Sequence, residues 1–165
     1  RYAGELANEL GNLLNRVVSM VGRYRDGRVP AAPAEGGEVA AAVAATVAAV
    51  RDAFDRLDLT RALEEAWDLV RRLNRLVEQR APWALAKDPA RAGELDRTLH
   101  ELAEGLRAVA ILLWPYVPGS AERALAALGQ DPGQVGLERA AWGAGTPEAR
   151  VVPVAPLFPR VEVAA

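Results

Sequence analysis

Cysteine is missing from the 165 residues, and histidine occurs once, at His100. Without cysteine the chain has no disulfide, no zinc finger and no thiol nucleophile, and a single histidine cannot build a histidine-based metal cage. No glycine-rich phosphate loop follows a predicted strand, and no Ser–His–Asp pattern is present. We therefore expect no catalytic residue, metal or cofactor in this chain.

Long apolar runs and an excess of basic charge are also missing. The most apolar run covers only residues 39–50, which is shorter than the ~20 residues that a membrane helix needs. Lys and Arg number 20 against 22 Asp and Glu, a net charge of −2, so a nucleic acid would have to be held by local contacts. We expect a soluble, cytoplasmic chain with no membrane and no DNA partner. Because it begins with Arg rather than Met, we also expect a piece of a larger protein.

Helical periodicity dominates the first three quarters of the chain, where apolar residues recur at steps of three and four. The pattern predicts a first helix that ends near Asp26–Gly27 and three further long helices, over about 35–54, 58–81 and 88–114, with Asp58 or Thr60 capping the third and Asp88 the fourth. A short fifth helix is predicted over 121–128, capped by Ser120. The carboxylate pairs Glu64–Glu65 and Glu101–Glu104 are expected on solvated helix faces.

The last part of the chain, 130–165, differs from the rest. It holds five of the eleven prolines, with valine-rich pieces between them. Proline removes a backbone donor and interrupts helices, so we expect an extended arm whose apolar residues need a surface to pack on. The sequence therefore predicts an all-α bundle of four to five helices over 1–129, followed by an extended C-terminal arm over 130–165.

Two features stand out from this helical background. Asn12 and Arg16 lie four residues apart and therefore side by side on the polar face of the first helix. Their amide and guanidinium groups suit the edge of a nucleobase, although an ordinary solvated face has the same composition. Trp83 does not follow helical spacing and lies in a stiff loop between Pro82 and the cap at Asp88. A ring in that place suits stacking on an unpaired base, and it equally suits plugging the core beneath the loop.

At these residues the chain resembles the α-helical anticodon-binding domain of the methionyl-tRNA synthetase family, a family of class I synthetases. The resemblance is carried, in the right order and over nearly the whole chain, by residues 7–16, 24–27, 81–88 and 156–160. In the family, the residues that match Asn12 and Arg16 contact anticodon bases. The match of Trp83 stacks on the cytosine of the CAU anticodon, and the match of Pro82 shapes its loop. The resemblance thus implies binding to the anticodon loop of tRNA(Met).

The same resemblance implies a parent enzyme that joins methionine to tRNA with ATP. Its catalytic domain, with the signature loops and zinc-bearing insertion of the family, is not in this sequence, so ATP and zinc are expected in that missing part. The arm is expected to dock on that catalytic domain in cis. Arg23, Arg72, Arg75 and Lys87 are candidate contacts to the tRNA backbone, chosen by charge and helix face. Two alternatives stay open: a helical protein-interaction module, and the anticodon-binding domain of another class I synthetase.

Overall fold

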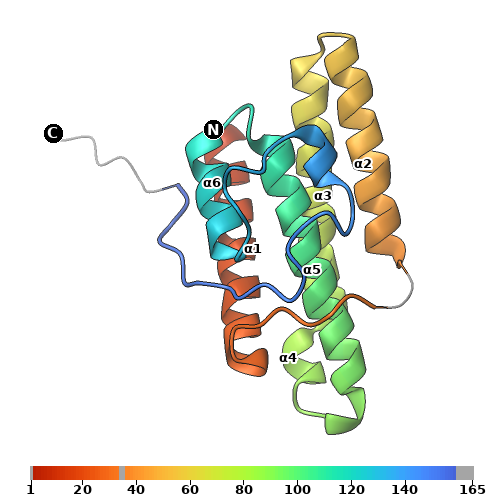
Figure 1. Ribbon diagram of the computed structural model, residues 1–165, viewed down its shortest axis with the longest axis vertical. Coiled ribbons are helices and arrows are strands. Elements are labelled where there is room, and N and C mark those ends of the chain that lie inside the picture. The colour runs from red at the N-terminus through yellow and green to blue at the C-terminus, as the bar shows by residue number, and fades with distance from the viewer. Residues whose placement is uncertain (1, 34–35, 159–165) are drawn as a thin grey trace, which may run out of the picture.

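The computed structural model describes residues 2–33 and 36–158. Within these residues the chain forms six α-helices and two 3₁₀ helices: α1 (Tyr2–Arg25), α2 (Glu38–Asp55), α3 (Leu59–Arg80), α4 (Pro82–Leu85), η1 (Pro89–Arg91), α5 (Ala92–Leu113), α6 (Pro118–Ala127) and η2 (Leu137–Ala140). The long helices lie side by side as a bundle (Figure 1). The predicted all-α bundle is confirmed, and the additional α-helix is the single turn α4.

Helix α5 is the centre of the bundle and packs against α1, α2, α3 and α6. Every residue of α5 from Glu101 to Leu113 is buried, because neighbouring elements cover it on all sides. Its contact with α3 is close: a Cβ atom added at Gly105 would lie 2.7 Å from Cδ2 of Leu73. Glycine at this position therefore permits the two helices to approach one another.

Three of the predicted helix ends are confirmed by their hydrogen bonds or backbone angles. The Asp58 carboxylate accepts the backbone N–H of Arg61 at 2.9 Å and caps α3. The Asp88 carboxylate accepts the N–H of Ala90 at 3.0 Å, where η1 leads into α5. At the end of α1, Asp26 and Gly27 both adopt left-handed backbone, with φ of 51° and 79°.

Two predicted helix starts are wrong. The second helix begins at Glu38 rather than near 35, because Gly37 keeps extended backbone in front of it, and residues 34–35 lie outside the described part. The fifth begins at Pro118 rather than 121, since the fixed φ of proline suits the first helical position. Ser120 is therefore not a cap, and its Oγ instead donates to the carbonyl of Leu157 at 3.2 Å.

The prediction that Glu101 and Glu104 lie on a solvated face is also wrong. Their exposed fractions are only 1% and 9%. Glu101 pairs with Arg80 of α3, and Glu104 pairs with Arg107 of α5 at 2.6 Å. Burial is tolerated because each carboxylate has a guanidinium partner. The alternation of charge along α5 looks like that of an exposed helix, so the sequence pattern is misleading here.

Over its described length, 130–158, the C-terminal arm consists of turns and extended pieces apart from η2, and it contacts the bundle at several points (Figure 1). The Val29 N–H donates to the Ala149 carbonyl at 2.9 Å, and the Val151 N–H donates to the Gly27 carbonyl at 2.7 Å. Val151 is buried by this contact. The bundle itself thus supplies a surface for the arm, and docking on a catalytic domain stays a prediction.

Candidate nucleic-acid interface

Trp83 lies on α4, the single helical turn that directly follows α3. Helix α3 ends at Arg80, and Ala81 adopts left-handed backbone with φ 43° and ψ 67° before Pro82 begins α4. The predicted stiff loop is therefore a helical turn, because proline is favoured at the first position of a helix. Pro82 and Leu85 are buried, whereas Trp83 is 38% exposed. The turn is anchored by its buried residues and presents the indole ring to solvent.

Arg16 of α1 lies beside Trp83, although the two are far apart in the sequence. The guanidinium carbon of Arg16 is 5.7 Å from the centre of the indole ring, within the range of a cation–π contact. Nη2 of Arg16 also pairs with Oε1 of Glu78, in the last turns of α3, at 2.8 Å. We call Arg16, Glu78 and Trp83 the Arg16–Trp83 cluster. It joins three helices at the surface of the bundle.

Asn12 and Arg23 lie on the same face of α1 as Arg16. Asn12 is one helical turn before Arg16 and exposed, and Arg23 is two turns after it and also exposed. The guanidinium carbon of Arg23 is 6.0 Å from the centre of the Tyr24 ring. The face therefore presents an amide and two guanidinium groups along one stripe, with the Trp83 ring beside the middle one.

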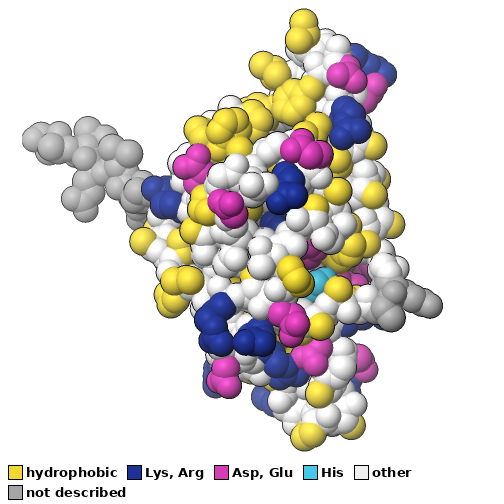
Figure 2. Space-filling model, in the orientation of Figure 1, with side chains coloured by type: hydrophobic (Ala, Val, Ile, Leu, Met, Phe, Trp, Pro, Cys, Tyr) yellow, Lys and Arg dark blue, Asp and Glu magenta, His cyan; other side chains and the backbone are white. Residues whose placement is uncertain are grey.

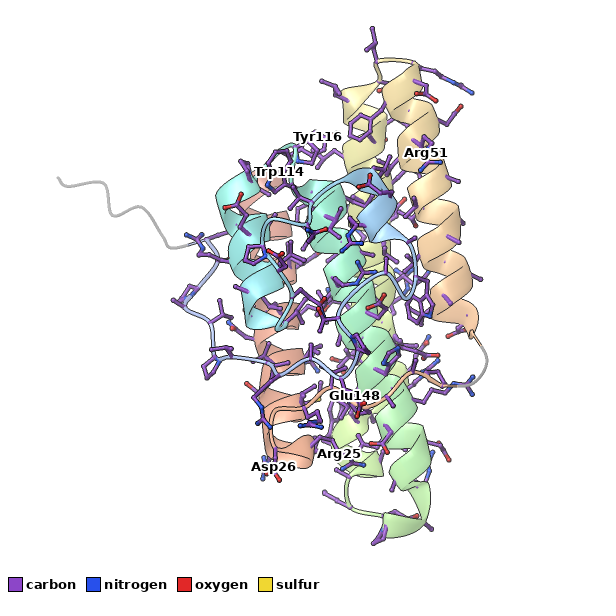
Figure 3. All side chains as sticks on the ribbon, viewed as in Figure 1. Arg25, Asp26, Arg51, Trp114, Tyr116 and Glu148 are labelled. Carbon is purple, nitrogen blue, oxygen red and sulfur yellow. The ribbon has the colours of Figure 1, made fainter. Side chains whose placement is uncertain are left out.

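The residues predicted to contact the tRNA backbone are exposed, as a phosphate contact requires. Arg72 and Arg75 lie in the second half of α3, and Lys87 lies two residues after the end of α4. Arg23 lies in the last turn of α1, at the end of the bundle that also carries α4 and where Figure 3 labels Arg25 and Asp26. The cluster residues are in contact, whereas these four basic residues are placed only by their helix positions and exposure.

Glu78 and the partly buried pair of Arg80 with Glu101 were missed by sequence reasoning. No local spacing links Glu78 to Arg16, since the ion pair forms only when α1 and α3 pack together. Arg80 is the residue immediately before Ala81, and its partner comes from α5. A basic residue next to a proline-containing break gives no indication that its partner is a buried carboxylate on another helix.

The face of the molecule drawn in Figure 2 shows no broad positive patch among the described residues. On the face in Figure 2, basic side chains gather near the lower end of α1, and elsewhere charges of both signs are interspersed. Within 2–33 and 36–158, no group of three or more His, Cys, Asp or Glu is arranged to hold a metal ion, and no helix is long and apolar enough to cross a membrane. His100 lies at the core edge, with Nδ1 2.9 Å from the Pro30 carbonyl.

Comparison with known proteins relates almost the entire chain to methionine–tRNA ligases. It is 35% identical over 164 residues to the enzyme of Enterococcus faecalis, and 40% identical over 166 residues to that of Deinococcus radiodurans. These matches cover 96% and 98% of this chain, but the chain spans only 24% of the length of each relative. No protein-family model matches the chain.

Solved structures agree with the sequence matches. The free form of Mycobacterium tuberculosis methionyl-tRNA synthetase superposes with a TM-score of 0.81 at 38% identity, covering 96% of this chain and 33% of that one. The same enzyme in complex with methionyl-adenylate gives a TM-score of 0.79 at 37% identity, covering 93% and 31%. The chain thus matches one helical part of class I aminoacyl-tRNA synthetases. Within that class it belongs to the methionine–tRNA ligase family.

This relationship confirms the family resemblance and does not support the alternative of a different class I synthetase. Most of the motif residues lie in the described part of the chain. Pro159 and Arg160, which close the last of the resembling segments, lie outside it.

Proposed function

We propose that this chain is the part of a methionine–tRNA ligase that binds the anticodon loop, and that the Arg16–Trp83 cluster holds the first base of a CAU anticodon. The observation that carries the proposal is the exposed indole of Trp83 with the Arg16 guanidinium beside it. The ring offers a flat surface to an unstacked base, and the guanidinium offers donors to the edge of that base.

The neighbouring residues extend this interface. The Asn12 amide, one turn away from Arg16, carries both a donor and an acceptor and reads a second set of base atoms. Pro82 is buried and fixes the backbone on which Trp83 stands. Arg23, Arg72, Arg75 and Lys87 contact phosphates, which position the RNA without reading its sequence.

The rest of the enzyme supplies the chemistry. In the complete protein a catalytic domain, not spanned by this chain, joins methionine to tRNA(Met) with ATP in the cytoplasm. That assignment is supported by identity of 35% and 40% to methionine–tRNA ligases over nearly the whole chain. The C-terminal arm contacts that domain in cis, and this chain itself carries no catalytic residue and needs no metal or ATP.

The test is binding of anticodon stem-loops to the chain at low salt. A CAU loop is compared with a loop changed only at the first anticodon base. We expect the CAU loop to bind more tightly, and Trp83→Ala to weaken its binding by roughly 1–3 kcal/mol, about 5- to 150-fold.

Trp114→Ala is the matched control, because it removes a partly buried indole at the opposite end of the bundle (Figure 3). It should leave stem-loop binding unchanged. Equal binding of both loops by the wild-type chain would instead favour the helical protein-interaction module. Equal effects of Trp83→Ala and Trp114→Ala would remove the stacking role of Trp83.

A further inference from the structure

We infer that Glu101 is a positioning residue for Trp83: its buried carboxylate holds Arg80 and thereby sets the angle at which the α3–α4 turn presents the indole ring. This inference rests on the proposed function of the Arg16–Trp83 cluster. It adds Glu101 of α5, whose side chain is 1% exposed.

The first step of the argument is the position of Arg80. It is the last residue of α3, three residues before Trp83, and the residue between Arg80 and Pro82 is the left-handed Ala81. A left-handed backbone costs a non-glycine residue roughly 1–2 kcal/mol, so this conformation has to be enforced by contacts on both sides. After the turn, the buried Pro82 and Leu85 supply them. Before the turn, the contacts come from Arg80.

The second step is what Arg80 binds. Nη1 of Arg80 donates to Oε2 of Glu101, which is 1% exposed on α5. Nη2 of Arg80 lies 3.6 Å from Oε1 of Glu38 at the start of α2. The end of α3 is therefore tied to two other helices by a single guanidinium group. A planar guanidinium with several donors in fixed directions orients its partner more strictly than an ammonium would.

The third step is that the carboxylate of Glu101 is held in place at a cost. Its Oε1 is buried with no hydrogen-bond partner and lies 3.5 Å from Nε of Arg97. A Cβ atom at Gly37 would lie only 2.7 Å from this oxygen, so glycine leaves the room that the carboxylate occupies. The Arg80 side chain is 26% exposed, and an ion pair with one buried partner adds little to stability compared with well-packed apolar side chains. Its use here is geometric, because it fixes one orientation of the turn that carries Trp83.

The experiment uses the full chain labelled with 5-fluorotryptophan, which gives a ¹⁹F resonance for each of the four tryptophans. Trp83→Phe assigns the Trp83 resonance. We expect Glu101→Gln to shift or broaden that resonance in the free protein and to weaken CAU stem-loop binding by on the order of tenfold, as loss of a supporting partner does at other preorganised sites. The preference for CAU over the changed loop should fall as well.

Glu104→Gln is the matched control, since it also removes a buried carboxylate charge from α5. Glu104 pairs with Arg107 and accepts the N–H of Gly143, next to Trp142. The Glu104→Gln variant should therefore change the Trp142 resonance and leave the Trp83 resonance and stem-loop binding unchanged. A loss of binding that is equal in both variants would mean that general destabilisation, and not positioning, is responsible.

Two further variants keep the test decisive if Glu101→Gln unfolds. Arg80→Lys retains the charge without the planar group and should give an intermediate effect on the Trp83 resonance. The double variant Arg80→Met with Glu101→Leu removes both charges and should keep or raise the melting temperature, yet still bind the CAU stem-loop poorly.

A double variant that is stable and binds with wild-type affinity and preference would overturn the inference. A wild-type chain without CAU preference would overturn the proposed function instead, while the Trp83 resonance would still test the positioning.

Discussion

The Arg16 side chain takes part in two contacts at once, one with the indole of Trp83 and one with the carboxylate of Glu78. The ion pair is substantially exposed, with 41% and 62% of the two side chains accessible, so its own contribution to stability is small. In the proposed complex its effect on the RNA is larger, because the Glu78 carboxylate lies beside the guanidinium that would meet the base. Sequence spacing indicated Arg16 and Trp83 separately and gave no sign of Glu78.

Glu78→Gln is expected to tighten binding of anticodon stem-loops of any sequence by a few-fold, roughly 1 kcal/mol or less. The neutral amide removes repulsion of the RNA and still accepts a hydrogen bond from Arg16. The measurement is the dissociation constant for the CAU loop and for the changed loop, with Glu64→Gln, an exposed carboxylate on the same helix, as control. Weaker binding by Glu78→Gln would mean that its charge serves chiefly to orient Arg16.

Tyr116 is a second residue whose surroundings lead to a prediction. Its hydroxyl donates to the Leu59 carbonyl at 2.6 Å, and burial, followed by the negative charge of Asp58, raises the pKa of the phenol above 10.0. The unfolded chain therefore loses this proton first as the pH rises, so the free energy of unfolding falls in alkaline solution. The free energy of unfolding can be measured by urea denaturation at several pH values between about 9 and about 11. It should fall less steeply with pH in Tyr116→Phe than in the wild-type chain. An equal fall of the free energy of unfolding with pH in the two proteins would contradict the prediction.

At the scale of the elements, the long helices and the short helix α6 were predictable from the sequence, whereas the single turn α4 and the exact start of α6 were not. Apolar periodicity and the caps at Asp58 and Asp88 are local signals, and they located α3 and the entry to α5. Helices α4 and α6 begin at Pro82 and Pro118, whereas the sequence pattern predicts a loop after Pro82 and a helix start at residue 121. Proline is compatible both with a helix start and with a loop, and packing of the following residues decides between them.

The joint between α6 and the arm depends on Gly129. Its φ is +72°, and a Cβ atom there would collide with the backbone of Arg150. Gly143 has a similar φ of +79° but has nothing within 4 Å of such an atom. We expect Gly143→Ala to cost about 1 kcal/mol for the left-handed backbone, and Gly129→Ala to cost about 1–3 kcal/mol more for the collision.

Chemical denaturation of the two glycine variants measures this difference directly. Both substitutions have the same effect on the unfolded chain. The difference between their losses in the free energy of unfolding therefore isolates the contact between the arm and the bundle. Equal destabilisation would mean that the arm moves aside at little cost.

At the scale of the whole molecule, the net charge of −2 leaves RNA binding to a few basic side chains. Each phosphate contact to a single-stranded loop contributes about −0.7 to the slope of log K against log salt concentration. If Arg23, Arg72, Arg75 and Lys87 all contact phosphates, the slope should be about −3. Replacing any one of these residues with Gln should make the slope shallower by about 0.7 and should weaken the binding of both stem-loops equally.

Titration of stem-loop binding at several salt concentrations checks this for each residue in turn. A variant that keeps the wild-type slope has lost no phosphate contact, and the residue would then be dropped from the interface. If a substitution changes the preference between the two loops, the replaced residue contacts a base rather than a phosphate.

The amino-acid sequence by itself determined the helical class, the end of α1, the caps at Asp58 and Asp88, and the residues of the family motif, because each depends on neighbours within a few positions. Only the tertiary structure decided that Trp83 is exposed, that Arg16 meets both Trp83 and Glu78, and that Glu101 and Glu104 are buried with arginine partners. These contacts join helices distant in the sequence, and burial depends on what covers a face. A local pattern of charges and apolar residues carries no information about that covering.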